Sequence, residues 1–96
     1  MNYSEILEQL CSIPSPSGFE TRAAQAALER LRPFVDEAFL DKMGNVVGIR
    51  RCGREGAKKL LLDAHLDEIG FLVVGHKDGF LRLAPLGGVD VRMLPD

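Results

Sequence analysis

The residues best suited to chemistry are His65 and Asp67, which lie two positions apart in the stretch LLLDAHLDEIG. Along an extended backbone, side chains two positions apart point to the same face, so this imidazole and this carboxylate can converge. An imidazole that ligates a metal through one ring nitrogen usually donates its other N–H to a carboxylate, which fixes its tautomer. The pair therefore suits a metal site in which Asp67 either orients His65 or is itself an oxygen ligand.

The same residues also fit a purely structural role. His-x-Asp is a common combination, and a histidine hydrogen-bonded at a strand end, with Asp67 and Glu68 capping a turn, would look the same in the sequence. A catalytic zinc ion typically takes three protein ligands and a water molecule, and His76 is expected at a solvated hairpin tip. The chain therefore offers one suitable histidine. Three carboxylates border another predicted hairpin and are expected to be solvated: Asp36, Glu37 and Asp41.

The element that must present the pair is an apolar run at residues 60–64, directly before His65. The run shows no alternation between apolar and polar residues, which is typical of a strand covered on both faces. Its carboxyl end carries polar, metal-capable side chains, as at the end of a strand that opens into a site. We therefore predict a central strand here.

A short helix and a loop are expected at the start of the chain. Asn2 and Glu5 have the spacing of a helix cap, and apolar residues follow on one helical face. This helix should end before Pro14. Residues 12–18 are rich in proline and serine, which favours a loop.

A second helix is expected from about residue 18 to residue 32. Ser17 and Glu20 have the spacing of a capping box, in which each side chain caps the other residue's backbone. Pro33 should end the helix, since proline lacks the N–H that the next turn requires.

Two antiparallel hairpins complete the prediction. Residues 35–40 and 46–50 flank the turn sequence DKMGN, and residues 70–75 and 80–83 flank HKDG, where Asp-Gly is a strong hairpin signal.

Composition narrows the class of protein. The chain has 96 residues, 46% of them hydrophobic, which is enough for one small folded domain. Its 12 basic and 14 acidic residues give a net charge of -2, so no basic field attracts nucleic acid or an anionic membrane. Without a signal segment or an apolar run of roughly 20 residues, we expect a cytoplasmic protein with no membrane partner. Cys11 and Cys52 are expected to be reduced thiols.

Several motifs occur in an order that resembles the N-terminal part of metallopeptidase family forty-two. This family comprises aminopeptidases, including tetrahedral, dodecameric enzymes and glutamyl aminopeptidases, and some of its members are described as endoglucanases. The motifs cover nearly the whole chain: residues 12–20 (SIPSPSGFE), 41–45 (DKMGN), 64–71 (AHLDEIGF), 78–81 (DGFL) and 85–89 (PLGGV). Such an ordered set is far more specific than His-x-Asp alone.

The resemblance implies a fold and a set of roles. Residues 1–69 would be the N-terminal part of a zinc-peptidase-like α/β catalytic domain, and residues 70–96 would begin an inserted β-rich dimerisation domain. Two divalent metal ions, zinc or cobalt, are implied in each full-length subunit, with His65 as a ligand of one metal and Asp67 as the catalytic-site aspartate that orients it. Peptide substrates and a homo-oligomer, a dodecamer in the family, are implied as well.

The family's bridging aspartate, general-base glutamate and remaining metal ligands lie later in its sequences. We therefore expect a dimetal-dependent aminopeptidase, present here as an N-terminal fragment that is inactive alone and binds metal weakly or not at all. The alternative is a small, non-catalytic α/β interaction module that keeps the scaffold without the chemistry. A glycoside hydrolase would need two carboxyl groups flanking a sugar, and no such pair stands out. Residues after about 70 are expected to depend on packing partners.

Overall fold

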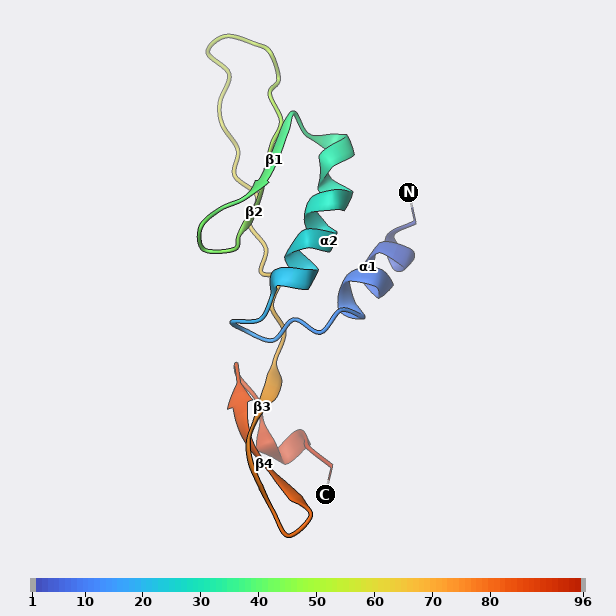
Figure 1. Ribbon diagram of the computed structural model, residues 1–96. Coiled ribbons are helices and arrows are strands. Elements are labelled where there is room, and N and C mark those ends of the chain that lie inside the picture. Colours follow the sequence, from blue (N-terminus) through green and yellow to red (C-terminus); the bar gives the residue numbers. More distant parts are fainter. Residues whose placement is uncertain (1, 96) are drawn as a thin grey trace.

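The computed structural model describes residues 2–95, which form an elongated molecule of two lobes (Figure 1). Its principal extents are 65 × 30 × 23 Å and its radius of gyration is 18.0 Å, whereas a compact chain of this length has a radius of about 13 Å. The N-terminal lobe holds two helices and a hairpin, and the other lobe is a second hairpin followed by a 3₁₀ turn at Val91–Met93. This shape leaves most side chains close to solvent.

The first helix, α1, spans Tyr3–Cys11 and begins as predicted. The side-chain oxygen of Asn2 accepts the N–H of Glu5 at 3.2 Å, which satisfies one of the amides that a helix start leaves unpaired. The helix ends before Pro14, and the predicted loop follows. α1 lies beside the second helix (Figure 1).

The second helix, α2, spans Thr21–Leu31 and continues into a 3₁₀ turn at Arg32–Phe34. The predicted capping box of Ser17 and Glu20 is wrong, because Glu20 makes no capping hydrogen bond. Its carboxylate instead accepts the N–H of Gly18 at 2.7 Å, in a turn where Gly18 has a φ of 91°. The carboxylate of Glu20 therefore stabilises the turn before the helix, and α2 begins at Thr21, later than predicted.

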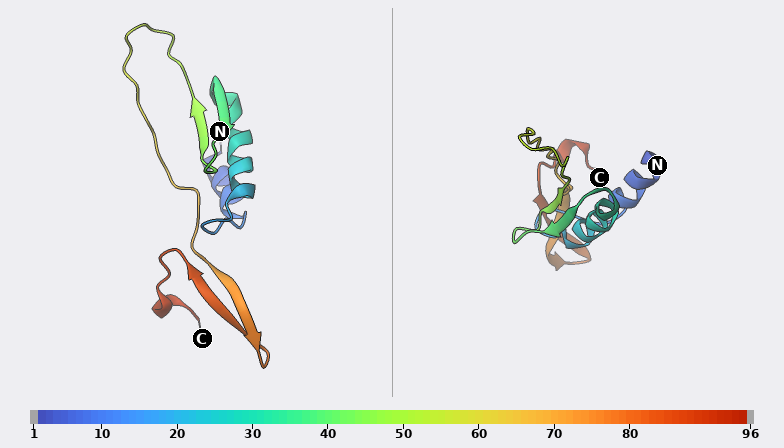
Figure 2. Two further views of the ribbon diagram at one scale, coloured as in Figure 1. Left: turned by 60° about the vertical axis from the view of Figure 1, so that its left-hand side comes forward. Right: turned by 90° about the horizontal axis from the view of Figure 1, so that it is seen from above.

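Helix α2 packs on an antiparallel hairpin of β1, Glu37–Leu40, and β2, Val46–Ile49 (Figure 2). This is the first hairpin that the sequence predicts. The core of the lobe is formed by three buried residues of α2: Ala23, Ala24 and Leu28. Helix and hairpin approach closely at Gly48, where an added Cβ would lie 2.5 Å from Cδ2 of Leu31.

The turn between β1 and β2 is organised by the carboxylate of Asp41. Its oxygens accept the backbone N–H groups of Met43 and Asn45, both at 2.9 Å, and the side-chain amide of Asn45 at 2.8 Å. These hydrogen bonds, that of the Asn45 side chain foremost, hold the pKa of Asp41 below its ordinary value. The turn is therefore most stable when Asp41 is ionised.

The second lobe is an antiparallel hairpin of β3, Gly70–Lys77, and β4, Phe80–Leu86. Asp78 and Gly79 join the strands with φ values of 53° and 81°, as a tight turn of type I′ requires. The predicted hairpin is confirmed, with longer strands. The prediction of His76 at the tip is wrong, because His76 pairs with Leu81 inside the ladder, although it remains exposed.

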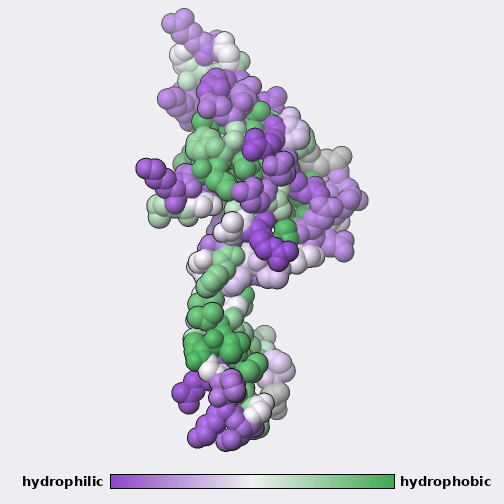
Figure 3. All heavy atoms as spheres, viewed as in Figure 1, coloured by the Kyte–Doolittle hydropathy of each residue, from purple (hydrophilic) through white to green (hydrophobic). Residues whose placement is uncertain are grey.

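Apolar side chains gather on the surface of this hairpin (Figure 3). The exposed ones are Phe71, Leu72, Val73, Val74, Phe80, Leu81 and Leu83. Consecutive residues of a strand point to opposite faces, so this run places apolar groups on both faces of β3. The dependence of residues after 70 on packing partners stays a prediction, and this exposure gives it a physical basis.

The predicted central strand at residues 60–64 is wrong. The run lies in an irregular segment (yellow in Figures 1 and 2), and Leu60, Leu61 and Leu62 are 84%, 87% and 85% exposed. A strand needs a neighbour that pairs with its backbone N–H and C=O groups, and residues 2–95 place no strand beside this run. The apolar pattern indicated burial but could not supply the partner.

Other predictions concern the chain as a whole. The mixture of helices and small antiparallel sheets confirms the α/β class, whereas the division between residues 69 and 70 stays a prediction. Cys11 and Cys52 are free, as expected. Among residues 2–95, no helix has the length and apolar character needed to cross a bilayer.

Replacing Gly48 tests the close contact between α2 and β2. We expect Gly48→Ala to destabilise the N-terminal lobe by about 1–3 kcal/mol, because its methyl group forces Leu31 to move. Gly75→Ala is the matched control, since an added Cβ there meets no atom within 4 Å. The measurement is native-state amide exchange of α2 and β2, and equal effects of the two substitutions would contradict the packing described.

Lowering the pH tests the Asp41 turn. Folding lowers the pKa of Asp41, so its stabilising effect is fully present above the ordinary value of 3.8 and is lost as the pH falls through the lower, folded value. We expect cross-strand NOEs between β1 and β2 to weaken in that acid range, and Asp41→Ala to weaken them at neutral pH. The exposed Lys42 of the same turn gives the control Lys42→Ala, and indistinguishable NOEs in the two variants would count against this account.

Candidate functional site

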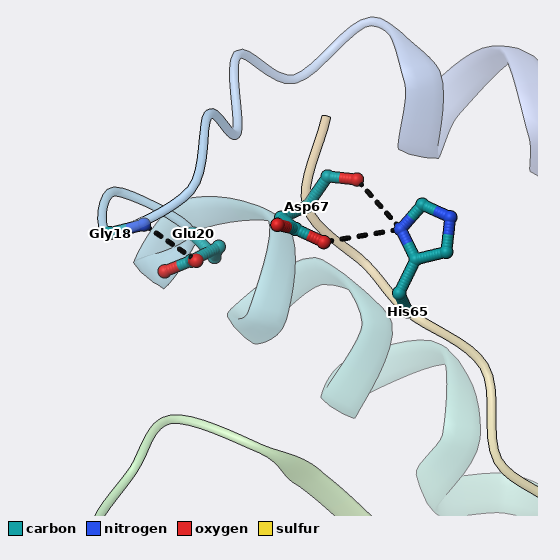
Figure 4. Close-up of polar contacts among 4 residues, drawn as sticks. All are labelled: Gly18, Glu20, His65 and Asp67. Carbon is teal, nitrogen blue, oxygen red and sulfur yellow. Dashed lines mark hydrogen bonds and ion pairs between the residues drawn. The ribbon is translucent and has the colours of Figure 1, made fainter. Parts of the chain in front are cut away.

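The candidate site lies where the segment before β3 passes the loop between α1 and α2 (Figure 4). Glu68 joins the two: its backbone N–H donates to the carbonyl of Ser15 at 2.9 Å, and its carboxylate accepts the N–H of Ser15 at 2.9 Å. Ser15 is 3% exposed, and Pro16 forms a parallel bridge with Glu68. We call this set of contacts the Ser15–Glu68 clamp, and it fastens the site to the N-terminal lobe.

His65 and Asp67 meet beside this clamp. Nδ1 of the imidazole lies 3.1 Å from Oδ1 of Asp67 and 3.0 Å from the backbone oxygen of Asp67 (Figure 4). The two side chains therefore converge, as their spacing suggested, although the backbone before them is not a strand. The metal-ligating role of His65 and the orienting role of Asp67 stay predictions.

The partners of Nδ1 determine the tautomer of His65. Both partners are oxygen atoms that accept, so Nδ1 must carry the hydrogen. A neutral imidazole has a single N–H, which leaves an unshared electron pair on Nε2. The side chain of His65 is 86% exposed, so Nε2 is accessible. This arrangement allows His65 to bind a cation through Nε2 while Asp67 holds the opposite side of the ring.

A groove of about 970 Å³ runs beside the pair, which is a volume typical of small-molecule sites. Helix α2 and strand β2 form one side, and residues 61–67 form the other. Its ionisable side chains are Glu20, Asp41, Asp63, His65 and Asp67. Sequence reasoning missed the first three as groove residues, since carboxylates so far apart in the chain carry no local signal that they will line one groove.

The described residues supply only part of a metal centre. Within residues 2–95, no three His, Cys, Asp or Glu side chains are grouped so that they could hold an ion. His65 fits one position in such a centre, because its Nδ1 is held by a carboxylate and its Nε2 is free. Asp36 and Glu37, predicted to be solvated, both bind Arg51: Asp36 accepts its backbone N–H, and Glu37 pairs with its guanidinium.

Comparison with known proteins gives consistent matches. The profile of the M42 glutamyl aminopeptidase family matches residues 44–96, which include His65, Asp67 and Glu68. The chain is 36% identical over 88 residues to the lysyl aminopeptidase of Pyrococcus furiosus, a match that covers 88% of this chain and 24% of that protein. It spans about a quarter of the length of the curated relatives it matches.

Two solved structures resemble the chain. An aminopeptidase of the archaeon Desulfurococcus kamchatkensis is similar with a TM-score of 0.84 and 40% identity, covering 92% of this chain and 24% of that one. An endoglucanase of Thermotoga maritima is similar with a TM-score of 0.80 and 40% identity, covering 93% of this chain and 29% of that one. Identity at this level supports a shared local fold over nearly the whole chain.

Nitrogen-15 NMR of the imidazoles tests the tautomer. At mildly alkaline pH, where free imidazole is neutral, we expect His65 to carry its hydrogen on Nδ1. His76 serves as the internal reference, because its ring makes no hydrogen bond within the described part of the chain. Asp67→Ala should shift His65 towards the tautomer mixture of His76. A His65 signal that matches His76 in the unsubstituted chain would contradict the geometry.

Proposed function

Because the chain belongs to the M42 glutamyl aminopeptidase family, we propose that it forms one wall of the active site of an aminopeptidase that releases N-terminal residues from peptides. The observation that carries the proposal is the His65–Asp67 pair, in which a carboxylate holds Nδ1 and leaves Nε2 free at the edge of a groove. This is the arrangement of a histidine prepared to ligate a metal. The family match covers the same residues.

In the proposed enzyme, His65 ligates one of two divalent ions through Nε2. Asp67 keeps the hydrogen on Nδ1 and limits rotation of the ring. The hydrogen bond from Nδ1 to this carboxylate also raises the basicity of the ligating nitrogen Nε2. The metal pair, zinc or cobalt, supplies Lewis-acid activation of the peptide carbonyl and of a water molecule when bound. The groove beside the pair is the proposed place of the N-terminal residue of the substrate.

The 96-residue chain by itself is proposed to be inactive. A catalytic centre needs about three protein ligands for a metal, and residues 2–95 bring no such group together. Weak metal binding follows, since the single imidazole nitrogen Nε2 of His65 gives one bond to an ion. The proposal also assigns residues 70–96 to an inserted domain that assembles a homo-oligomer, which the exposed apolar residues of β3 and β4 support.

The activity test compares the chain with a chimera. The chimera joins residues 1–96 to the part of the Pyrococcus furiosus lysyl aminopeptidase that follows the matched segment. With amino-acid p-nitroanilides and added zinc or cobalt, we expect turnover by the chimera and none above the blank by the 96-residue chain. Asp67→Asn in the chimera should lower kcat/KM by about 10- to 100-fold, and His65→Ala should remove activity.

The control in the chimera is His76→Ala, because His76 lies in β3 and outside the groove. It should leave kcat/KM near that of the unsubstituted chimera. Turnover by the 96-residue chain alone would refute its proposed inactivity. A chimera that keeps full activity after His65→Ala would refute the assignment of His65 as a metal ligand.

A further inference from the structure

We propose that Glu68 is a positioning residue for His65 and that it acts through the peptide unit it shares with Asp67. The inference rests on the proposed role of His65 and Asp67. Glu68 lies outside the His65–Asp67 pair, and its side chain makes no hydrogen bond with the imidazole. The juxtaposition that carries it is a single peptide group held at one end by the Ser15–Glu68 clamp and at the other end by His65.

The peptide group between Asp67 and Glu68 is planar, so its C=O and N–H point in fixed, opposite directions. Its N–H donates to the carbonyl of Ser15 at 2.9 Å. Its C=O lies 3.0 Å from Nδ1 of His65. Rotation of this group would lengthen both contacts together. The Ser15 carbonyl therefore sets the direction from which the backbone oxygen of Asp67 reaches the imidazole.

The carboxylate of Glu68 secures the other half of the clamp. It accepts the N–H of Ser15 at 2.9 Å, a hydrogen bond strengthened by the negative charge. Ser15 is 3% exposed, so water has little access to replace this partner. Pro16 lies beside Gly70 on the far side of the clamp, where an added Cβ on Gly70 would be 3.1 Å from Cβ of Pro16. The side chain and the backbone of Glu68 thus hold one buried residue from both sides.

No other ladder holds this stretch within the described part of the chain. Residues 60–64 form no strand, and the bridge between Pro16 and Glu68 is isolated. The loop that carries Ser15 is itself fixed, because the carbonyl of Pro16 accepts the N–H of Phe19 at 2.8 Å. Loss of the clamp would free the peptide group beside Asp67 and release the imidazole from its present orientation.

The test compares three substitutions of Glu68 in the 96-residue chain. Glu68→Gln keeps a side-chain oxygen for the N–H of Ser15, Glu68→Asp is one methylene too short to reach it, and Glu68→Ala has no acceptor. Glu55→Ala is the control, since Glu55 is an exposed residue of a distant turn. Amide exchange of β1 and β2 identifies the variants that keep the fold of the N-terminal lobe.

The first readout is the tautomer of His65 by nitrogen-15 NMR. We expect the Nδ1–H form in the Glu68→Gln and Glu55→Ala chains, and a tautomer mixture like that of His76 in Glu68→Asp and Glu68→Ala. If Glu68→Ala loses the protection of β1 and β2, the comparison of the Asp and Gln variants decides. An unchanged His65 tautomer in a folded Asp or Ala variant overturns the proposal.

The second readout is the affinity for Zn²⁺, followed by the His65 signals as zinc chloride is added. We expect a dissociation constant about 10- to 100-fold higher in Glu68→Asp and Glu68→Ala, and a value near that of the unsubstituted chain in Glu68→Gln. His65→Ala separates the two proposals. If it leaves zinc binding unchanged, the metal role of His65 fails, while a tautomer that depends on Glu68 still supports positioning. If His65→Ala removes zinc binding and the Glu68 variants change neither readout, positioning by Glu68 fails.

Discussion

The contact on which the rest of this structure depends is the Ser15–Glu68 clamp. It joins residues 53 positions apart, through hydrogen bonds from both the backbone and the side chain of Glu68. α1, α2 and the first hairpin all come before Glu68 in the chain, and β3 begins two residues after Glu68. A few hydrogen bonds can hold the two segments together because Ser15 is buried. Breaking them would leave its backbone groups unpaired and away from water, which is costly in free energy. The clamp places the candidate site at the junction of the lobes.

Much of the fold could be predicted because its signals are local. The cap at Asn2 and the Asp-Gly turn each depend on residues within a few positions, and both are present. The sequence wrongly predicts a strand at residues 60–64, because a strand requires a paired neighbour as well as apolar residues. The capping box at Glu20 failed for a related reason. The carboxylate of Glu20 accepts the backbone N–H of Gly18 instead of that of Ser17, which a capping box requires.

The candidate site shows the same division. The spacing of His65 and Asp67 was enough to predict that the imidazole and carboxylate converge. The tautomer of His65 could not be predicted from the sequence. It depends on which ring nitrogen faces the two oxygen atoms of Asp67, and one of these is a backbone oxygen that no motif encodes. In the sequence, Glu68 indicates only a turn cap. Its partner Ser15 lies in a loop far back in the sequence, so the hydrogen bonds between them leave no periodic pattern.

The exposed hairpin of β3 and β4 also affects the tendency of the isolated chain to self-associate in solution. A net charge of -2 spread over a molecule 65 Å long gives weak electrostatic repulsion between copies. Apolar side chains on the hairpin and three exposed leucines at residues 60–62 give attraction in return. The outer edges of the two hairpins can also add strands. The isolated polypeptide is therefore expected to self-associate. Its apparent size in solution should grow with protein concentration and with added salt, which screens the remaining charge repulsion.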